Sequence, residues 1–355
     1  WWDGVVGGWD FGLGYIVCGG THFTQSVLFG MTPSDICIFK TDTNGEEQWS
    51  KTFGSEYWDF GKSIQQTTNG GYVIAGYING FGMGGGNAYL LKVDENGEEQ
   101  WSQIFDFGIA ESVQQTTDGG YIITGYDSSD IYLVKIDENG EQQWSQTFGG
   151  PGNDKAHCVQ QTTDGGYIIT GEDEEGVYNP GNDFWTENSD LYLIKTNELG
   201  QEEWFQRFGE AGNDCGRSVQ QTSDGGYIIA GYLTPGKNQN SNIYLLKTND
   251  NGEEQWSQTF GGAGDETAQS VQQTSDGGYI IAAHTSTTNN ISNGVYLIKT
   301  DAQGNTPSTN ITDIPTLGKS LIKKIDILGR KTTNNKGFQV HIYDDGKVEK
   351  KYLIK

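Results

Sequence analysis

The sequence predicts an all-β protein built from six copies of one small four-stranded sheet, and three recurring motifs carry this prediction. The first motif is a Gly-Tyr followed by apolar residues, and it returns about every 50 residues. The second is a strand of the type Tyr-Leu-Ile-Lys. The third is a Trp nine residues after the lysine of the second motif, with a Phe four residues later. The key residues of the three motifs are Tyr15, Tyr72, Tyr121, Tyr167, Tyr227 and Tyr279; Lys40, Lys92, Lys135, Lys195, Lys247 and Lys299; and Trp49, Trp101, Trp144, Trp204 and Trp256.

Each repeat contains four short segments that are typical of strands. Examples are Ser270–Thr274, Tyr279–Ala282, Val295–Lys299 and, from the preceding repeat, Glu254–Phe260. They are rich in β-branched and aromatic residues and are bounded by Gly, Asn and Asp. Side chains alternate along a strand, so the Trp and Phe of the fourth segment share one face and are expected to pack against a neighbouring sheet. No helical periodicity is present in residues 1–305.

Four antiparallel strands in repeats of 40–50 residues are the signature of a β-propeller. We therefore predict an all-β, six-bladed β-propeller of four-stranded blades over residues 1–305, followed by a short C-terminal β module. The order of an apolar strand such as 227–231, a variable loop, a Tyr-bearing strand, a turn and a Trp resembles Kelch-like propeller repeats. The resemblance covers most of residues 1–305.

The two ends of the repeat array are irregular. No Trp strand follows Gly304, so the sixth repeat lacks its fourth strand. We expect residues 1–6 to supply that strand and to close the ring, which would remove an exposed sheet edge. The first repeat lacks a Ser-Val-Gln-Gln segment, because Trp9 and the residues after it run almost directly into Tyr15.

Charge is distributed unevenly along the chain. The formal net charge is −25; residues 306–355 hold ten basic and five acidic residues, which leaves −30 for residues 1–305. So acidic a domain repels nucleic acid and anionic lipid, and it favours neutral sugars, cations or basic partners. No segment approaches the roughly 18 apolar residues of a membrane-spanning helix. The chain starts at Trp1 without an initiator Met, which indicates a removed leader or an incomplete N-terminus.

Four cysteines are present, and none belongs to a Cys-x-x-Cys pair, which argues against zinc or thioredoxin-like chemistry. Cys18 and Cys37 fall on strands that we predict to be neighbours. A disulfide between them and two unpaired core residues are both compatible with the sequence.

Residues 306–316 have the composition of a linker, and residues 317–355 form the predicted C-terminal module. The module contains an Asp-Ile-Leu-Gly-Arg turn that ends at Arg330, an apolar strand into Tyr343-Asp-Asp-Gly, and a basic terminus. Together these features resemble the C-terminal sorting domain of type IX secretion cargo in Bacteroidetes. The resemblance implies export by that machinery, and release or attachment at the outer cell surface.

The connections between strands divide the propeller into two faces. Tight turns of the Thr-x-Asp-Gly-Gly and Asp-x-Asn-Gly types fall on one face. The second type faintly resembles a calcium loop, but it lacks the glycine and glutamate that an EF-hand requires, and we interpret it as a hairpin turn. Loops of variable length fall on the opposite face, since the Tyr-to-Lys spacing is 14 residues from Tyr121 but 28 from Tyr167. Variable loops on a rigid scaffold commonly carry binding sites.

The longest variable loop, predicted at Glu172–Asp190, places carboxylates beside aromatic rings, which can hold a cation or stack on a sugar. Its candidate ligand-binding residues are Asp173, Glu174, Glu175, Tyr178, Asp183 and Trp185. Nearby Gly-Asn-Asp and Gly-Asp motifs suggest oxygen ligands for a hard cation, with calcium as the expected cofactor. These candidate metal ligands are Asn153, Asp154, Asn213, Asp214 and Asp265. The alternative for both groups is a set of side chains that hydrogen-bond to their own loops.

Catalytic residues cannot be assigned from the sequence. The four histidines lie in separate parts of the chain without metal or triad spacing, and Arg207 and Arg217 are the only arginines in residues 1–305. We expect a secreted or cell-surface, non-catalytic propeller that binds a glycan, a protein or a cation through its variable-loop face. The alternatives are a carbohydrate-active enzyme with its site on that face, recognisable by two carboxylates in a pocket with perturbed pKa values, and a structural surface component.

Overall fold

The computed structural model describes residues 2–10, 14–22, 34–80, 86–105, 108–127, 129–150, 152–179, 184–236, 239–262, 264–286, 294–306, 321–325, 337–343 and 348–353. The chain forms two compact units, Trp1–Thr306 and Pro307–Lys355. Within the described residues every regular element is a β-strand. These residues contain no helix with the length and hydropathy needed to cross a membrane.

The first unit is a six-bladed β-propeller, as predicted, and each blade is one antiparallel sheet whose strands follow one another in the chain. Blade 1 contains β1 (Trp2–Asp10), β2 (Gly14–His22), β3 (Ser34–Thr41) and β4 (Glu47–Phe53). Blade 2 contains β5 (Trp58–Gln66), β6 (Tyr72–Gly80), β7 (Asn87–Val93) and β8 (Glu99–Phe105). Blade 3 contains β9 (Ile109–Gln115), β10 (Tyr121–Tyr126), β11 (Ile131–Ile136) and β12 (Gln142–Phe148).

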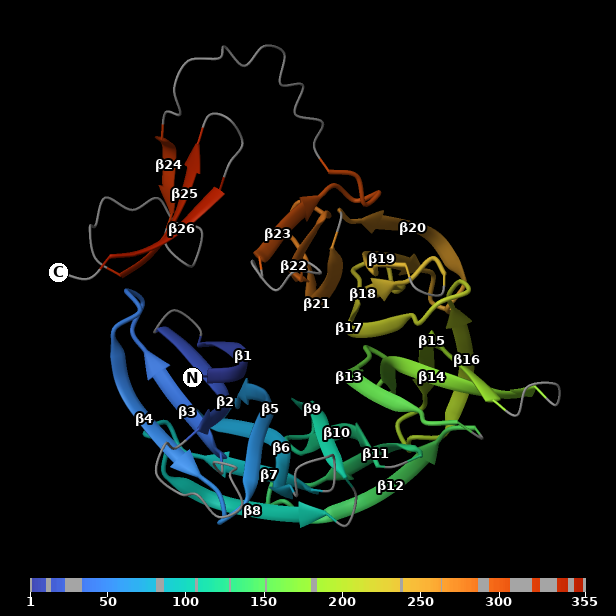
Figure 1. The fold of residues 1–355 in the computed structure, drawn as a ribbon. Coiled ribbons are helices and arrows are strands. Elements are labelled where there is room, and N and C mark those ends of the chain that lie inside the picture. Colours follow the sequence, from blue (N-terminus) through green and yellow to red (C-terminus); the bar gives the residue numbers. More distant parts are fainter. Residues whose placement is uncertain are drawn as a thin grey trace. The chain divides into compact units, whose positions relative to one another are not determined.

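The second half of the ring repeats this plan. Blade 4 contains β13 (Lys155–Gln161), β14 (Tyr167–Asn179), β15 (Phe184–Thr196) and β16 (Glu202–Phe208). Blade 5 contains β17 (Cys215–Gln221), β18 (Tyr227–Leu233), β19 (Asn242–Thr248) and β20 (Glu254–Phe260). Blade 6 contains β21 (Asp265–Gln273), β22 (Tyr279–Ser286) and β23 (Gly294–Thr300), so that its sheet has three strands among the described residues. In blades 2 to 6 the Ser-Val-Gln-Gln strand, or its equivalent, is innermost (Figure 1).

The expected closure of the ring by the N-terminal strand is wrong. Strand β1 pairs with β2, from Trp2 opposite Thr21 to Asp10 opposite Gly14, and it is therefore the first strand of blade 1. The physical reason is loop-closure entropy. Pairing β1 with β2 closes a loop of only three residues, which loses much less chain entropy than pairing β1 with a strand near residue 300. The first repeat thus has an inner strand of its own without the Ser-Val-Gln-Gln sequence.

Adjacent blades are wedged together by the Trp of one blade and the Tyr of the next, as predicted. Trp204 of blade 4 lies with its ring centroid 5.9 Å from that of Tyr227 in blade 5, in an edge-to-face arrangement. The turn glycine of the next blade covers the same indole, since a Cβ added to Gly252 would lie 2.6 Å from Cζ3 of Trp204. The same contact recurs in the pairs Trp49–Tyr72, Trp101–Tyr121, Trp144–Tyr167 and Trp256–Tyr279.

The lysine of the Tyr-Leu-Ile-Lys motif fixes the tight Thr-x-Asp-Gly-Gly turn. Lys195 is buried, donates to the backbone carbonyl of Thr196 at 2.8 Å and pairs with Asp164 at 2.9 Å. Asp164 in turn accepts hydrogen bonds from the hydroxyl of Thr162 and the backbone N–H of Gly166. The Asp-x-Asn-Gly sequences are hairpin turns, as interpreted. In one such turn, the Asp94 carboxylate accepts a hydrogen bond from the backbone N–H of Asn96. Gly97 has a φ of 79°, the left-handed conformation that favours glycine.

Cys18 and Cys37 lie on the neighbouring strands β2 and β3, as expected, and both are buried free thiols. The second unit holds one antiparallel sheet of β24 (Leu321–Ile325), β25 (Gly337–Tyr343) and β26 (Val348–Leu353). Its described part is therefore a β module, in agreement with the prediction.

Candidate functional site

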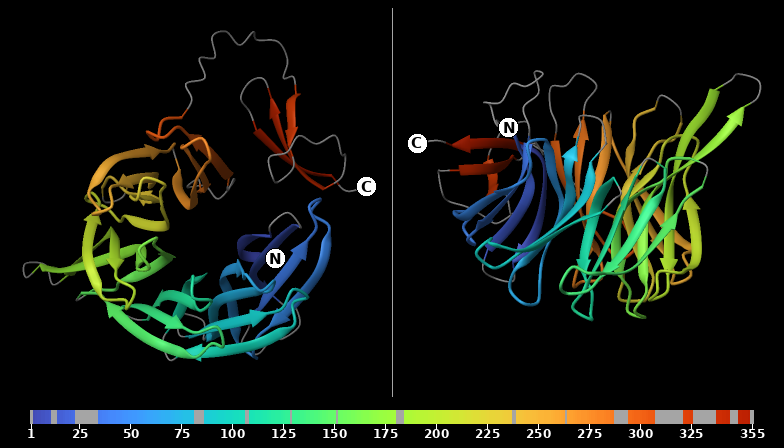
Figure 2. Two further views of the ribbon diagram at one scale, coloured as in Figure 1. Left: turned by 180° about the vertical axis from the view of Figure 1, so that it is seen from behind. Right: turned by 90° about the horizontal axis from the view of Figure 1, so that it is seen from below.

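The segment predicted as the longest variable loop is a strand hairpin instead. Strands β14 and β15 continue in register from Glu172 opposite Leu191 to Asn179 opposite Phe184, and the hairpin extends beyond the other strands at one end of the propeller (Figure 2). Tyr178 and Trp185 are direct cross-strand partners in this register. The insertion contains aromatic and β-branched residues such as Val177, Tyr178 and Trp185, and residues of these types favour strands.

The candidate ligand-binding residues lie at different positions along the hairpin, from its base outward. Asp173 and Glu174 lie at its base, where β14 leaves the body of the blade, and Asp173 is buried. Glu175, opposite Asn188, is one position further along the strand. Asp183 lies outside the described residues.

The base of the hairpin brings together residues from two predicted groups. The Nδ2 of Asn153 donates to Oε2 of Glu174 at 2.8 Å, and the carboxyl groups of Asp154 and Asp173 are hydrogen-bonded to each other. The two segments meet because β13 and β14 pair in register, with Lys155 opposite Glu172. Two segments that are separate in the sequence, Asn153–Asp154 and Asp173–Glu174, thus form one acidic cluster at the junction of blades 3 and 4.

Burial controls the ionisation of this cluster. Asp154 is 1% exposed, and its burial, together with the hydrogen bond to Asp173, raises the pKa of Asp154 to about 7. Asp173 accepts a hydrogen bond at its Oδ2 from Nε of Arg207 at 2.6 Å. The carboxyl group of Asp154 accepts one from the backbone N–H of Gly150, also at 2.6 Å. Asp154 is therefore partly protonated near neutral pH.

A cavity of about 350 Å³ adjoins the pair between blades 3 and 4. Its walls include Phe148, Tyr192 and Arg207. The Tyr192 hydroxyl and Oδ1 of Asp154 are buried and have no hydrogen-bond partner among the described residues. Burial also raises the pKa of Tyr192 well above its usual value, so that this hydroxyl stays protonated. Sequence patterns did not single out Tyr192, because it is part of a repeated strand motif, whereas the rarity of arginine could have drawn attention to Arg207.

The other candidate metal ligands lie at other blade junctions and hold loop backbone. Asp214 accepts from the backbone N–H groups of Glu210 and Thr234, both at 2.6 Å. Asn213 accepts from the backbone of Ser189 at 3.3 Å, and Asp265 accepts from that of Ser241 at 3.1 Å. Each of these contacts ties one loop to the next, as in the loop-anchoring alternative. The structure does not gather these residues with Asp154, and calcium binding stays a prediction.

A second cluster lies where the first two strands of blade 4 meet the inner strand of blade 5, and its residues were not predicted. His157, Glu172 and Cys215 bring a nitrogen, an oxygen and a sulfur atom within 4.8 Å of one another. Such a ligand set is typical of zinc. Two of the three residues, His157 and Cys215, belong to inner strands, and Glu172 takes a position that Tyr126 and Tyr232 hold in the adjacent blades.

The hydrogen bonds of this cluster do not favour a metal. NH1 of Arg217 lies 3.3 Å from Nδ1 of His157. A guanidinium can only donate, so Nδ1 accepts and Nε2 carries the ring proton, which leaves no lone pair for a metal. Glu172 is already paired with Lys155 at 2.8 Å. Burial raises the pKa of the Cys215 thiol far above its usual value and keeps it protonated. We interpret the cluster as a hydrogen-bonded group rather than a metal site.

Positive charge concentrates around His157. Burial lowers the pKa of His157 well below its usual value, and the cations Arg217, Lys62 and Lys155 lower it further. Lys62 of blade 2 pairs with Glu111 of blade 3 at 3.2 Å. His157 and Arg217 are the bulged residues of their strands, at the irregularities between Ala156 and Cys158 and between Gly216 and Ser218. Bulges re-aim a side chain and are common beside functional sites.

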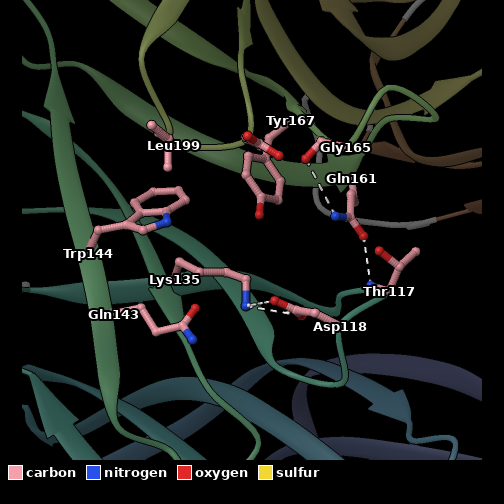
Figure 3. A pocket seen from close by; sticks show the side chains of 10 residues that line it. Thr117, Asp118, Lys135, Gln143, Trp144, Gln161, Gly165, Tyr167 and Leu199 are labelled. Carbon is pink, nitrogen blue, oxygen red and sulfur yellow. Dashed lines mark hydrogen bonds and ion pairs between the residues drawn. The ribbon is translucent and has the colours of Figure 1, made fainter.

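A larger hollow of about 640 Å³ lies on the opposite, tight-turn face (Figure 3). It is lined by Trp144, Tyr167, Leu199 and the Lys135–Asp118 ion pair of 2.9 Å. All these side chains except Leu199 belong to the motifs that recur in the other blades. We therefore assign this hollow to the structural framework of the repeats.

Comparison with known proteins gives fold neighbours only. No protein-family model and no curated protein matches the chain. Among solved structures, the Dos1 propeller is 10% identical with a TM-score of 0.49, over 99% of this chain and 81% of that one. Sqt1 from Chaetomium thermophilum is 9% identical with a TM-score of 0.45, over 96% and 93% of the two chains. The WD40 domain of Neurospora crassa Pan2 is 11% identical with a TM-score of 0.47, over 83% and 88%.

Proposed function

We propose that the chain is a secreted or cell-surface, non-catalytic β-propeller that binds a glycan through its variable-loop face. The observation that carries this proposal is the β14–β15 hairpin, which extends from that face and pairs Tyr178 with Trp185 across its two strands. The acidic cluster of Asp154 and Asp173 and the cavity beside it lie at the base of the same hairpin.

The chemistry of this face suits a sugar. Aromatic side chains offer apolar faces against which a pyranose can stack, while carboxylate, hydroxyl and guanidinium groups can hydrogen-bond its hydroxyl groups. The net charge of −30 over residues 1–305 disfavours nucleic acid and polyanionic partners. Calcium remains part of the proposal as a bridging ion at the carboxylates of this face.

A glycan array tests the proposal. Trp185→Ala is expected to abolish binding or weaken it at least tenfold, because it removes the larger ring of the cross-strand pair. Leu199→Ala is the matched control, since Leu199 is 54% exposed on the tight-turn face. Unchanged binding by Trp185→Ala would reject the hairpin as the contact. A purified protein that binds no glycan but forms ordered assemblies would favour a structural surface component instead.

The proposal includes export by the type IX machinery, on the basis of the sorting-domain resemblance of residues 317–355. The Kelch-like resemblance of the repeats belongs to the same picture of a bacterial surface protein. Deletion of residues 317–355 in a Bacteroidetes host tests this part. The shortened protein should stay inside the outer membrane while the full chain reaches the medium or the cell surface, and equal export of both would contradict the assignment.

A carbohydrate-active enzyme is the second candidate, and the Asp154–Asp173 pair in its cavity favours it. The raised pKa of Asp154 suits a general acid at neutral pH. However, the two carboxyl groups are in direct hydrogen-bond contact, whereas glycoside hydrolases separate theirs by roughly 5 to 9.5 Å. Incubation with polysaccharides separates the candidates, because release of sugars that stops in Asp154→Asn would establish the enzyme.

A further inference from the structure

Arg217 is a cation that makes no direct ion pair among the described residues. It contacts Nδ1 of His157 at 3.3 Å and the ring of Tyr232, whose centroid is 5.9 Å away, while Glu172 and Glu111 act on its charge from beyond ion-pair distance. Placing a guanidinium in partly buried surroundings without a directly paired carboxylate is costly.

Two hydrogen-bond donors beside this charge are unused. Nε2 of His157 and Nε of Arg217 are buried and have no partner among the described residues. Both nitrogens carry a hydrogen, because Arg217 occupies the acceptor position of the imidazole. Unpaired buried donors cost free energy, and they indicate a group that accepts hydrogen bonds. Both residues keep part of their surface exposed, so the cluster as a whole reaches solvent although the two donor atoms are buried.

The surroundings of the two donors combine positive charge with aromatic rings. Lys155 and Lys62 add two cations that form direct ion pairs with Glu172 and Glu111, whereas Arg217 forms none among the described residues. The ring of Tyr126 lies 6.3 Å from that of His157, and Tyr232 lies beside Arg217. The cluster therefore offers a guanidinium without a direct ion pair and two unused donors, with two tyrosine rings beside them.

We propose that Arg217 and His157 bind the carboxylate of an acidic sugar, a hexuronate, while Tyr126 and Tyr232 flank its pyranose ring. This inference rests on the proposed function, and it names the sugar class. A carboxylate accepts both free N–H groups, and a guanidinium binds it in a paired geometry. A single uronate carries one negative charge, which the directly unpaired guanidinium of Arg217 can offset. An acidic peptide carries several, and the net charge of the domain repels it.

Titration of the purified full-length chain with D-glucuronate, followed by calorimetry and by the shift in melting temperature, tests the inference. D-glucose and acetate are the matched ligands, because one lacks the carboxylate and the other lacks the ring. We expect the wild type to bind glucuronate at least tenfold more tightly than either control ligand. Arg217→Gln should lose at least tenfold in affinity, while Lys51→Gln, on the outer strand β4, should bind as the wild type does.

Arg217→Lys covers the case in which Arg217→Gln does not fold. It retains the charge and loses the planar fork, and it should bind glucuronate several-fold more weakly than the wild type. Equal affinity for glucuronate and glucose, or unchanged affinity in both Arg217 variants, would overturn the inference. So would a glutamate-rich peptide that displaces glucuronate and binds more tightly. If the array shows only neutral glycans that depend on Trp185, the proposed function stands and the uronate inference falls.

Discussion

The side-chain carbonyl of Gln160, on the inner strand of blade 4, accepts a hydrogen bond of 2.6 Å from the backbone N–H of Gln221, on the inner strand of blade 5. Gln221 returns the contact, because its own side-chain oxygen accepts from the backbone N–H of Thr163 in blade 4 at 2.9 Å. The Gln-Gln pair of each repeat thus ties neighbouring inner strands in both directions. The equivalent bonds of the inner strands are Gln65–Gln115, Gln114–Gln161 and Gln220–Gln273.

Replacing Gln160 by alanine should weaken the junction of blades 4 and 5. The change removes one acceptor and leaves the backbone N–H of Gln221 without its partner, which costs about 1–3 kcal/mol in the free energy of unfolding. Denaturant titration measures this cost. Gln142→Ala is the control, because the Gln142 side chain makes only an exposed hydrogen bond on the outer strand, and it should change stability little. Equal effects of the two variants would show that the glutamine hydrogen bonds between inner strands contribute nothing to stability.

Two glycine variants can measure how closely Trp204 packs against the turn of the next blade. Gly252 and Gly45 occupy equivalent turns with φ of 79° and 83°. The left-handed backbone conformation should therefore lower the free energy of unfolding of either alanine variant by roughly 1 kcal/mol. At Gly252 the new Cβ would also lie 2.6 Å from the Trp204 ring, while at Gly45 it would meet nothing within 4 Å. Thermal unfolding should show a clearly larger loss for Gly252→Ala. Matching losses would contradict close packing of Trp204 against the next blade.

The Asp164–Lys195 pair predicts an acid-sensitive contribution to stability. Burial opposes ionisation, but hydrogen bonds from Lys195 and Thr162 outweigh it and lower the pKa of Asp164 to about 2. Because the folded pKa is below the usual 3.8, the contribution is complete above about pH 4 and disappears as the pH falls towards 2. Unfolding at several pH values should show that Asp164→Asn differs from the wild type most above pH 4. A difference that grows on acidification would have the wrong sign.

The Asp154–Asp173 pair predicts the opposite behaviour near neutral pH. Since the pKa of Asp154 is raised from 3.8 to about 7, the folded protein binds a proton that the unfolded chain releases. Stability should therefore decrease as the pH rises from about 4 to 7 and level off above 7. Asp154→Asn cannot release this proton, and its melting temperature should depend less on pH in that window. A wild-type curve parallel to that of the variant would argue against the raised pKa of Asp154.

The repeated elements were predictable because their spacing is local information. The Tyr-Ile-Ile and Tyr-Leu-Ile-Lys segments became the second and third strands, and the contact of Trp204 with Tyr227 follows from the side-chain alternation of a strand. The irregular ends were not predictable in this way. We assigned residues 1–6 to a missing strand, whereas the short connection from Asp10 to Gly14 decided their pairing.

The candidate site was predictable only in part. Sequence patterns found Asp154 and Asp173, but not that pairing of β13 with β14 would join their carboxyl groups. The contact between His157 and Arg217 spans 60 residues and arises from bulges in two inner strands, which no local motif specifies. A comparison of the repeats position by position would have shown both residues as departures from their equivalents in other blades.

Hydrogen exchange of the full chain, with and without the glycan that binds best on the array, tests most directly whether the variable-loop face is the binding face. We expect slower exchange in the β14–β15 hairpin and in residues 152–157, with unchanged exchange at the tight turns around Gly165 and Gly200. Protection confined to those tight turns would place the ligand on the opposite face and contradict binding at the variable-loop face.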